Sequence, residues 1–261
     1  HVDLVREHIQ VRSVEGKRLD DHVAYLRIKQ FQQGTHDELL DVLGELRASD
    51  KKPLRAMVLD MRGNPGGLVD EAQAVADEFL SRGGIYSTRH RGKIDEDIRA
   101  HHGGAASKIP LVTLVNEYSA SAAELVAGAL QDNSRSLIVG ARTFGKGSVQ
   151  TIYTLAGNAG LRLTTMRYYT PKGHAIQARG ISPDVAIRYT EDNAPAAVNE
   201  GALDGHLPAD SKKSGPAPKR QIVGGKRPKY TPLAKVPVDP RAGDDIALRE
   251  AFTEALRRSR P

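Results

Sequence analysis

The sequence predicts an α/β fold made of β-α-β crossover units, followed by a C-terminal extension. Short apolar runs that suit buried strands alternate with helical patterns between Ala56 and Val139. No run approaches the roughly 18 apolar residues of a membrane-spanning helix. After Tyr189 the chain becomes rich in Pro, Gly, Ala and Lys, which is typical of a segment outside a packed core.

The N-terminal part predicts two strands and a helix. Residues 1–14 alternate weakly and suggest an edge strand, whereas residues 23–28 alternate clearly between apolar and charged side chains. Thr35 and Glu38 have the spacing of a capping box, in which two side chains bind each other's backbone amides. An amphipathic helix is therefore expected from Thr35 to about Ala48.

The central part supplies the crossover units. Residues 56–59 and 111–115 are continuous apolar runs, as expected of strands buried on both faces. The other elements are expected in this order: a helix at 68–80, a strand at 85–88, a polar surface loop or flap at 89–108, a helix from about 121 to 131, a strand at 137–139, and a hairpin of strands at 149–155 and 161–168.

The chain divides into a core at 1–189, a flexible Pro-, Gly- and Lys-rich linker at 190–243, and a region at 244–261 with the pattern of a terminal helix. The net charge is +6, and a basic segment can bind nucleic acid. Prolines and glycines interleave the charges, however, and Tyr230 is the only aromatic residue among them. The pattern favours a solvated linker and no nucleic-acid partner. The basic residues are Lys212, Lys213, Lys219, Arg220, Lys226, Arg227, Lys229 and Lys235.

Cysteine is absent, which excludes disulfides and thiolate zinc sites, and we expect no metal or other cofactor. The chain begins at His1 rather than Met, so we expect a fragment or mature segment whose targeting sequence is missing.

The first segment that could carry chemistry is residues 60–67 (DMRGNPGG), between a buried strand and a helix. Its glycines allow backbone conformations that leave N–H groups pointing outward, and such donors can hold a substrate oxyanion. Asp60 and Arg62 are close enough to pair and brace the turn. The alternative is a tight strand-to-helix connection without chemistry.

The second segment is residues 119–124 (SASAAE), at the start of the next helix. A serine at a helix N-terminus lies in a positive potential that favours a developing alkoxide. The alternative is an ordinary N-cap, because Glu124 would complete a capping box with Ser121. The local pattern does not separate Ser119 from Ser121 as a nucleophile.

The third segment is residues 145–150 (GKGSVQ), a glycine-flanked turn that enters a strand. Lys146 could point inward, where burial would disfavour its charged form and let it act as a base. Gln150 would share a face of the strand with Lys146 and orient its amine. The alternative is an exposed turn lysine.

Two other chemistries are disfavoured. Residues 140–146 have the glycine-to-lysine spacing of a phosphate-binding loop, but Gly147 stands where Ser or Thr should bind magnesium. His101 and His102 lie in a polar loop without the carboxylate set of a metal site. A serine–histidine–aspartate triad could recruit His174, but its surroundings suggest a surface loop.

Together these residues resemble the carboxy-terminal processing peptidases, also called tail-specific proteases, which use a Ser/Lys dyad. The resemblance runs from about Asp3 to Tyr189 and includes residues 60–67, 119–124, 143–150, 169–173 and 180–184. In that family the nucleophile precedes the lysine by 25 positions, the spacing between Ser121 and Lys146. The resemblance therefore favours Ser121 over Ser119, and a glutamine four positions after the lysine matches Gln150.

The resemblance also implies the rest of the site and the fold. It suggests the amides of Gly67 and Ala122 as the oxyanion hole, and supporting roles for Asp60, Arg62 and Glu124. The implied fold is a crotonase- and Clp-like α/β core. Members usually carry a PDZ domain that binds substrate C-termini. No segment here matches one, so we expect it upstream.

The resemblance implies a serine endopeptidase that cleaves proteins near unstructured C-terminal tails through an acyl-enzyme. It also implies an extracytoplasmic place, the periplasm of a bacterium. A homo-oligomer and an adaptor protein remain open as partners. Two rivals remain: a non-catalytic binding protein on the same fold, and a nucleic-acid or scaffold role for the basic segment.

Overall fold

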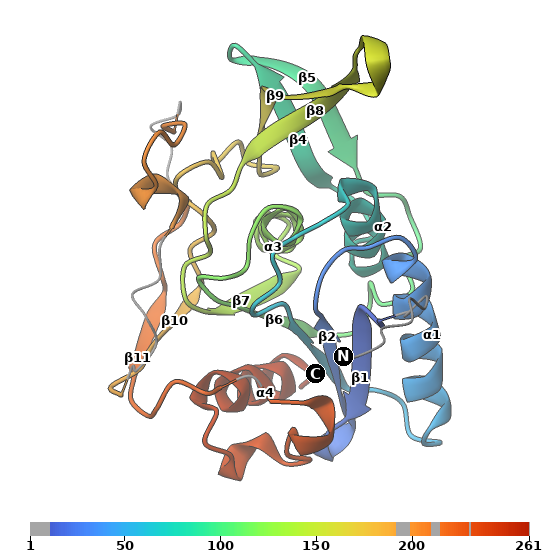
Figure 1. Ribbon diagram of the computed structural model, residues 1–261. Helices are drawn as coiled ribbons and strands as arrows, with labels where there is room; N and C mark the ends of the chain where they lie inside the picture. Colours follow the sequence, from blue (N-terminus) through green and yellow to red (C-terminus); the bar gives the residue numbers. More distant parts are fainter. Residues whose placement is uncertain (1–10, 192–198, 210–214, 230, 261) are drawn as a thin grey trace, which may run out of the picture.

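The structure is a computed structural model that describes residues 11–191, 199–209, 215–229 and 231–260. Seven strands form the main sheet in the order β1-β2-β3-β6-β7-β10-β11 (Figure 1). Only β1 and β2 pair antiparallel, and all the other neighbours are parallel. The strands are β1 (Val14–Arg18), β2 (Val23–Ile28), β3 (Ala56–Asp60), β6 (Leu111–Val115), β7 (Ser136–Gly140), β10 (Val185–Arg188) and β11 (Arg220–Val223).

Helices cover both faces of this sheet, which confirms the predicted α/β fold. Side chains that alternate along a strand reach opposite faces. Leu26, Met57 and Leu59 pack with the helices of one face, whereas Tyr25 and Val58 pack with α4 on the other. The first face carries α1 (Thr35–Ala48), α2 (Val69–Phe79) and α3 (Ala122–Asp132), and the second carries α4 (Ile246–Arg258).

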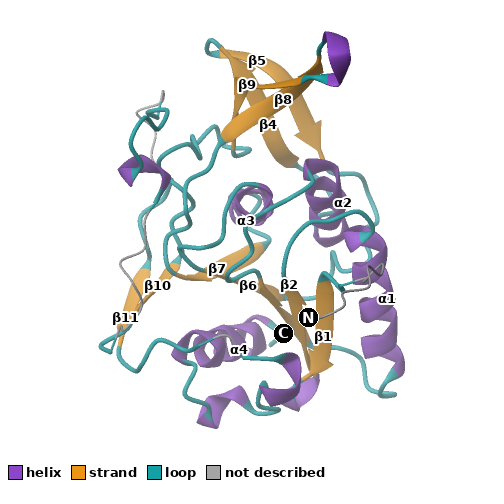
Figure 2. Cartoon of the chain, in the orientation of Figure 1, coloured by secondary structure: helices purple, strands orange, loops and turns teal. Residues whose placement is uncertain are grey.

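A second, smaller sheet projects from the main body (Figure 2). Its strands are antiparallel and lie in the order β5-β4-β9-β8, so β8 is an edge strand. Tyr86 and Tyr168 meet edge to face at its base, with ring centroids 5.4 Å apart, and join the core beneath it. The strands are β4 (Gly84–His90), β5 (Lys93–Arg99), β8 (Ser148–Thr154) and β9 (Gly160–Tyr169).

The predicted central elements are confirmed, with ends that differ by one or two residues, but the N-terminal prediction needs correction. Residues 1–10 of the expected edge strand lie outside the described residues, and the strand that is present, β1, begins at Val14. The capping box of Thr35 and Glu38 is wrong, because Gly34 is the N-cap of α1.

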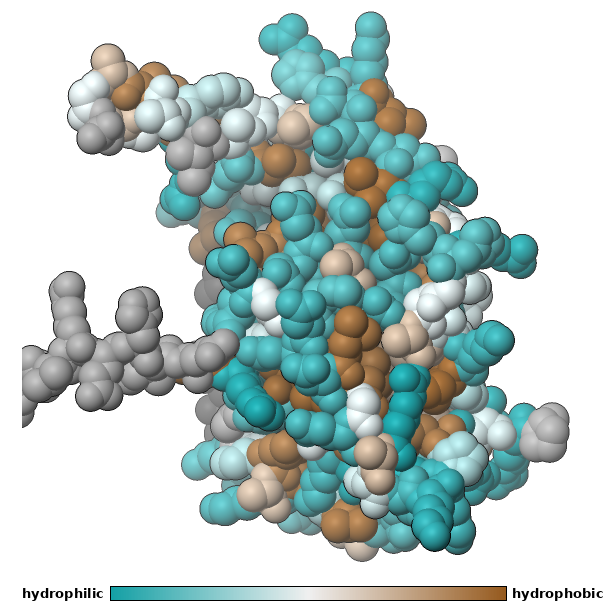
Figure 3. Space-filling view, turned by 90° about the vertical axis from the view of Figure 1, so that its right-hand side faces the viewer, coloured by the Kyte–Doolittle hydropathy of each residue, from teal (hydrophilic) through white to brown (hydrophobic). Residues whose placement is uncertain are grey.

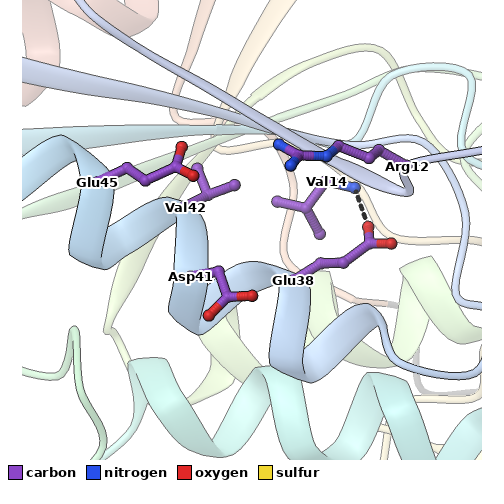
Figure 4. Close-up of a pocket in the computed structure, with 6 residues that line it drawn as sticks. All are labelled: Arg12, Val14, Glu38, Asp41, Val42 and Glu45. Carbon is purple, nitrogen blue, oxygen red and sulfur yellow. Dashed lines mark hydrogen bonds between the residues drawn. The ribbon is translucent and has the colours of Figure 1, made fainter.

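Glu38 instead ties β1 to α1. It accepts hydrogen bonds from the Ser13 amide at 2.7 Å and from the Val14 amide at 3.0 Å. Figure 4 shows the bond to Val14. The cleft of about 400 Å³ drawn there contains none of the candidate site residues. The side of the molecule that carries α1 is mostly hydrophilic (Figure 3). Within the described ranges, no helix has the length and apolar character needed to cross a bilayer.

The loop expected at 89–108 contains a strand. β5 pairs with β4 through a tight turn at Arg91 and Gly92, whose φ angles of 48° and 81° suit a hairpin connection. Five of its seven residues are exposed in an unbroken run, so the strand carries no apolar alternation for sequence reasoning to detect.

Part of the expected linker is also ordered. β11 extends the main sheet by pairing with β10 from Val185 opposite Arg220 to Arg188 opposite Val223. Neither strand was predicted, because four residues are too few to give a clear period beside prolines, glycines and lysines. The terminal helix α4 is confirmed.

Candidate active site

Ser121 lies where the chain leaves β6 and enters α3, as its N-cap. Its φ and ψ of 55° and −119° are unusual for a residue with a Cβ atom. Such strain persists only where the surroundings fix it, and it is concentrated at functional sites. The predicted capping box is confirmed, since the Ser121 amide donates to Glu124 Oε2 at 2.8 Å.

Burial separates the two serines that the sequence could not. Ser119 is fully buried, and its hydroxyl donates to the Met61 carbonyl at 2.8 Å and accepts from the Asn116 amide at 3.0 Å. This hydroxyl therefore holds two loops together. Ser121 is only half-buried, so its hydroxyl is the one a substrate could reach.

The glycine turn of residues 66–67 lies directly against Ser121. A Cβ atom on Gly66 would come within 2.8 Å of Ser121 Cβ and 2.9 Å of the Ala122 amide nitrogen. Gly66 also has a φ of 98°, which side chains disfavour. Only glycine allows this approach.

The backbone leaves the amides of Gly67 and Ala122 without a partner in the bridge and in the helix, respectively. The Phe31 amide donates to the Gly66 carbonyl at 2.9 Å, and the Leu68 amide donates to the Phe31 carbonyl at 2.8 Å. In such a parallel bridge the N–H of the central residue, Gly67, points away from the partner. Ala122 is the first residue of α3, so its amide has no partner within the helix.

Glu124 joins the serine to the lysine turn. Its Oε2 accepts from the amides of Ser121 and Lys146, each at 2.8 Å. Its Oε1 accepts from Thr143 Oγ1 at 2.5 Å and from the Gly145 amide at 2.7 Å. The backbone nitrogens of Ser121 and Lys146 are therefore no farther apart than twice 2.8 Å.

The Glu124 carboxyl is fully buried, and burial raises its pKa to about 7 although four hydrogen bonds to it act in the opposite direction. Desolvation favours the protonated acid, whereas four donors favour the carboxylate. Since all four partners donate, a proton on either oxygen displaces a donor. These four hydrogen bonds, which we call the Glu124 clamp, are therefore all present only when Glu124 is ionised.

Lys146 is half-buried, and within the described part of the chain no hydrogen bond joins its amine to Ser121 or to Gln150. Gln150 is exposed in β8, and a register shift between Val149 and Gln150 interrupts the regular alternation that placed it on the face of Lys146. The backbone after Lys146 is fixed, because the Gly147 amide donates to Gln177 Oε1 at 3.0 Å.

Asp60 and Arg62 form a buried ion pair behind the glycine turn. Arg62 Nη2 lies 2.7 Å from Asp60 Oδ2, and Tyr25 donates to the same oxygen at 2.7 Å. Burial by itself would raise the pKa of Asp60, but the charge and hydrogen bonds of Arg62, with the charge of Arg27, lower it to about 2. Arg62 Nη1 also binds Asp245, at 2.8 and 3.0 Å.

Two of the histidines considered as candidates, His174 and His101, lie away from Ser121. His174 Nδ1 is 3.6 Å from Asp132, at the C-terminal end of α3, whereas Ser121 precedes its first residue. With about 1.5 Å of rise per residue, the eleven residues of α3 separate these two ends by roughly 16 Å. His101 pairs with Asp77 on the surface. No group of three or more metal-binding side chains occurs among the described residues.

Residues 140–146 do not form a phosphate-binding loop, because Lys146 leads into β8 and not into a helix. Sequence reasoning missed three supporting residues: Thr143, Gln177 and Asp245. Thr143 lies inside residues 143–150, one of the segments that carry the family resemblance. Gln177 and Asp245 are single polar residues in irregular regions, so only the fold connects them to the site.

The chain is similar in sequence and fold to known proteins. The model of peptidase family S41 matches residues 22–187. A carboxy-terminal-processing protease of Bartonella bacilliformis is 40% identical over 96% of this chain and 56% of its own length. A carboxyl-terminal-processing protease of Synechocystis is 37% identical over 77% of this chain and 48% of its own length.

A solved structure titled photosystem II D1 C-terminal processing protease has a TM-score of 0.63 and 33% identity, covering 69% of this chain and 50% of that chain. The chain thus spans about half the length of these relatives. The resemblance drawn from the motifs is confirmed, and the chain belongs to peptidase family S41.

Proposed function

We propose that this chain is the catalytic part of a serine endopeptidase that cleaves protein substrates near their C-terminal tails, through a Ser121/Lys146 dyad. The observation that carries the proposal is the Glu124 carboxylate, which binds the amides of both residues at 2.8 Å. Residues 25 positions apart are thereby held within side-chain reach of each other. A serine hydroxyl needs such a neighbouring base to become a nucleophile.

In the proposed reaction, uncharged Lys146 takes the Ser121 proton as the hydroxyl oxygen attacks the scissile carbonyl carbon. The amides of Gly67 and Ala122 donate to the oxyanion that forms, and loss of one such donor costs on the order of 10²–10³ in rate. The tetrahedral intermediate then collapses, the C–N bond breaks, and Lys146 gives its proton to the leaving amine. Water, deprotonated by Lys146, releases the acyl group from Ser121.

Two surfaces support binding of an extended chain. β8 begins two residues after Lys146 and is an edge strand, so its free side can pair with a substrate backbone. A shallow groove of about 480 Å³ lies beside Gly67, between residues 30–33 and 65–68. Gln150 on β8 would act on the lysine amine only after a side-chain rearrangement, because it is exposed here.

The setting is also part of the proposal. The two named sequence relatives are bacterial proteins, and we place this protein outside the cytoplasm, in the periplasm. Its substrates would be proteins with unstructured C-termini, delivered with or without an adaptor protein. Selection of tails would depend on a PDZ domain elsewhere in the protein, and the oligomeric state is open to test.

The test is labelling with a serine-reactive peptidyl phosphonate, with the modified residue identified by mass spectrometry. Ser121 is the expected residue, and Ser121→Ala and Lys146→Ala should abolish both labelling and casein cleavage without unfolding the protein. Ser119→Ala is the comparison variant: it loses a buried hydroxyl that holds the neighbouring loops but keeps the nucleophile, so labelling of Ser121 should persist at a reduced rate. Full activity in Lys146→Ala would refute the dyad.

The rival function is a non-catalytic binding protein on the same fold. The presence of both Ser121 and Lys146, joined through one carboxylate, argues against it. Absence of labelling in a folded wild-type protein, together with ligand binding, would favour the rival. Tail specificity has a separate test: a substrate with its disordered tail removed should be cleaved more slowly than the intact substrate.

A further inference from the structure

The C-terminal helix reaches the back of the candidate active site through one ion pair. Arg62 Nη1 lies 3.0 and 2.8 Å from the two carboxylate oxygens of Asp245. Both side chains are largely buried, with 13% of Arg62 and 19% of Asp245 exposed. The charges of Asp60 and Asp245 raise the pKa of Arg62 against the effect of its burial, so the guanidinium stays charged. Arg62 therefore bridges a sheet carboxylate and a helix carboxylate.

Asp245 performs two tasks at once. It is the N-cap of α4, where its Oδ1 accepts from the Leu248 amide at 3.0 Å. The same carboxylate binds Arg62. A cap requires only a polar side-chain oxygen, and asparagine serves as well as aspartate. Binding of a guanidinium by two oxygens requires the carboxylate.

The residues on each side of Arg62 hold the loop that leads to Ser121. Met61 accepts the Ser119 hydroxyl at 2.8 Å, and the Gly63 amide donates to Asn116 Oδ1 at 2.9 Å. Further along the same turn, the Ala120 amide donates to the Asn64 carbonyl at 2.9 Å. A shift of the Arg62 backbone would therefore move both the glycine turn and the serine loop.

The surrounding space would permit such a shift. A cavity of about 240 Å³ borders Arg62, Gly63, Asn116 and Asp245. Because a cavity adjoins Arg62, its guanidinium is held by Asp60 on one side and by Asp245 on the other rather than by dense side-chain contact alone.

We propose that Asp245 is a positioning residue for peptide hydrolysis. By binding Arg62 it makes α4 part of the support for the glycine turn of residues 66–67 and for the loop that leads to Ser121. The inference rests on the proposed function, and it extends the catalytic unit to a helix that touches neither Ser121 nor Lys146 through any hydrogen bond in the described part of the chain.

The test uses Asp245→Asn, which keeps the cap but loses the charge. We expect a fall in kcat on the order of 10²-fold for peptide cleavage, with little change in KM, because small misplacement of reacting groups has costs of this size. Arg62→Lys should behave similarly, since an ammonium cannot bind Asp60 and Asp245 in the same forked way. The double variant should be no worse than either single variant.

Glu250→Gln is the matched control. Glu250 also ties α4 to the rest of the protein, through Arg220, but at the far edge of the sheet. It should lower the unfolding midpoint without changing kcat. Hydrogen exchange gives a readout that needs no activity. The amides of residues 61–64 and 66, which all donate hydrogen bonds, should exchange at least tenfold faster in Asp245→Asn and at the wild-type rate in Glu250→Gln.

Wild-type kcat and wild-type exchange in Asp245→Asn would overturn the inference. An equal loss of kcat in Glu250→Gln would do the same, because it would point to general destabilisation. A wild-type protein without hydrolytic activity would instead refute the proposed function, and the exchange measurement would then decide the role of Asp245 in holding the turn.

Discussion

Replacement of Glu124 by glutamine tests the centre of the site. The carboxylate accepts two donors at each oxygen, from Ser121 and Lys146 on one side and from Thr143 and Gly145 on the other. Whichever way the new amide is turned, its NH₂ group faces two donors. A buried polar group left without a partner costs about 1–3 kcal/mol, so two cost about 2–6 kcal/mol. Removal of a buried charge offsets part of this loss, which favours the lower end.

The free energy of unfolding, measured with urea at pH 8, should therefore fall by about 2 kcal/mol or more. This is a large part of the total stability of an ordinary domain, which is about 5–15 kcal/mol. The rate of phosphonate labelling at Ser121 should fall on the order of 10²-fold in the fraction that remains folded, because neither Ser121 nor the lysine turn is held as before. A variant with wild-type stability and wild-type labelling would refute the clamp.

Glu38→Gln is the matched control. All three of its donors, the Ser13 amide, the Ser13 hydroxyl and the Val14 amide, bind Oε2. A glutamine can place its single carbonyl oxygen there, so the loss of stability should be smaller and labelling should be unchanged.

Three further predictions follow from the geometry. Gly66→Ala should abolish labelling, because its Cβ would lie 2.8 Å from Ser121 Cβ, whereas Gly63→Ala, with no atom within 4 Å, should cost only the strain of its φ of 73°. Burial raises the pKa of Glu124 from 4.5 to about 7, so the folded protein holds this proton more tightly than the unfolded chain. The stabilisation that comes from protonated Glu124 is therefore complete below about pH 4.5 and is lost as the pH rises to about 7. Urea unfolding of the wild type should show this loss, and urea unfolding of Glu124→Gln should lack it. Finally, kcat/KM should rise as the pH passes about 7, because Glu124 accepts all four hydrogen bonds only when it is ionised, and a profile that falls through this range would count against that role.

The sequence predicted the parts of the fold whose side chains have to be apolar. Strands such as 56–60 and 111–115 are buried on both faces, so their composition alone identifies them. β5 and β11 were missed because exposed strands can carry charges, which leaves no alternation. β10 was missed although Val185 and Ile187 are buried, because four residues are too few to show a clear period.

The candidate site was predicted as three separate segments, and the fold brings them together at the ends of β3, β6 and β7. The local pattern suits both Ser119 and Ser121, and only the family resemblance, through the spacing to Lys146, favours Ser121; the burial of Ser119 is a separate observation that needs the structure. Asp245 could not be found from the sequence, since its partner Arg62 is 183 positions away and nothing near either residue indicates the other.

That separation has a consequence for newly made protein. Synthesis runs from the N-terminus, so the arginine is present long before its second carboxylate. Given the role proposed for Asp245, a chain still attached to the ribosome holds its oxyanion-binding amides only loosely. Hydrolytic competence would then arrive only once α4 has been made, and a chain shorter than that could not digest its neighbours.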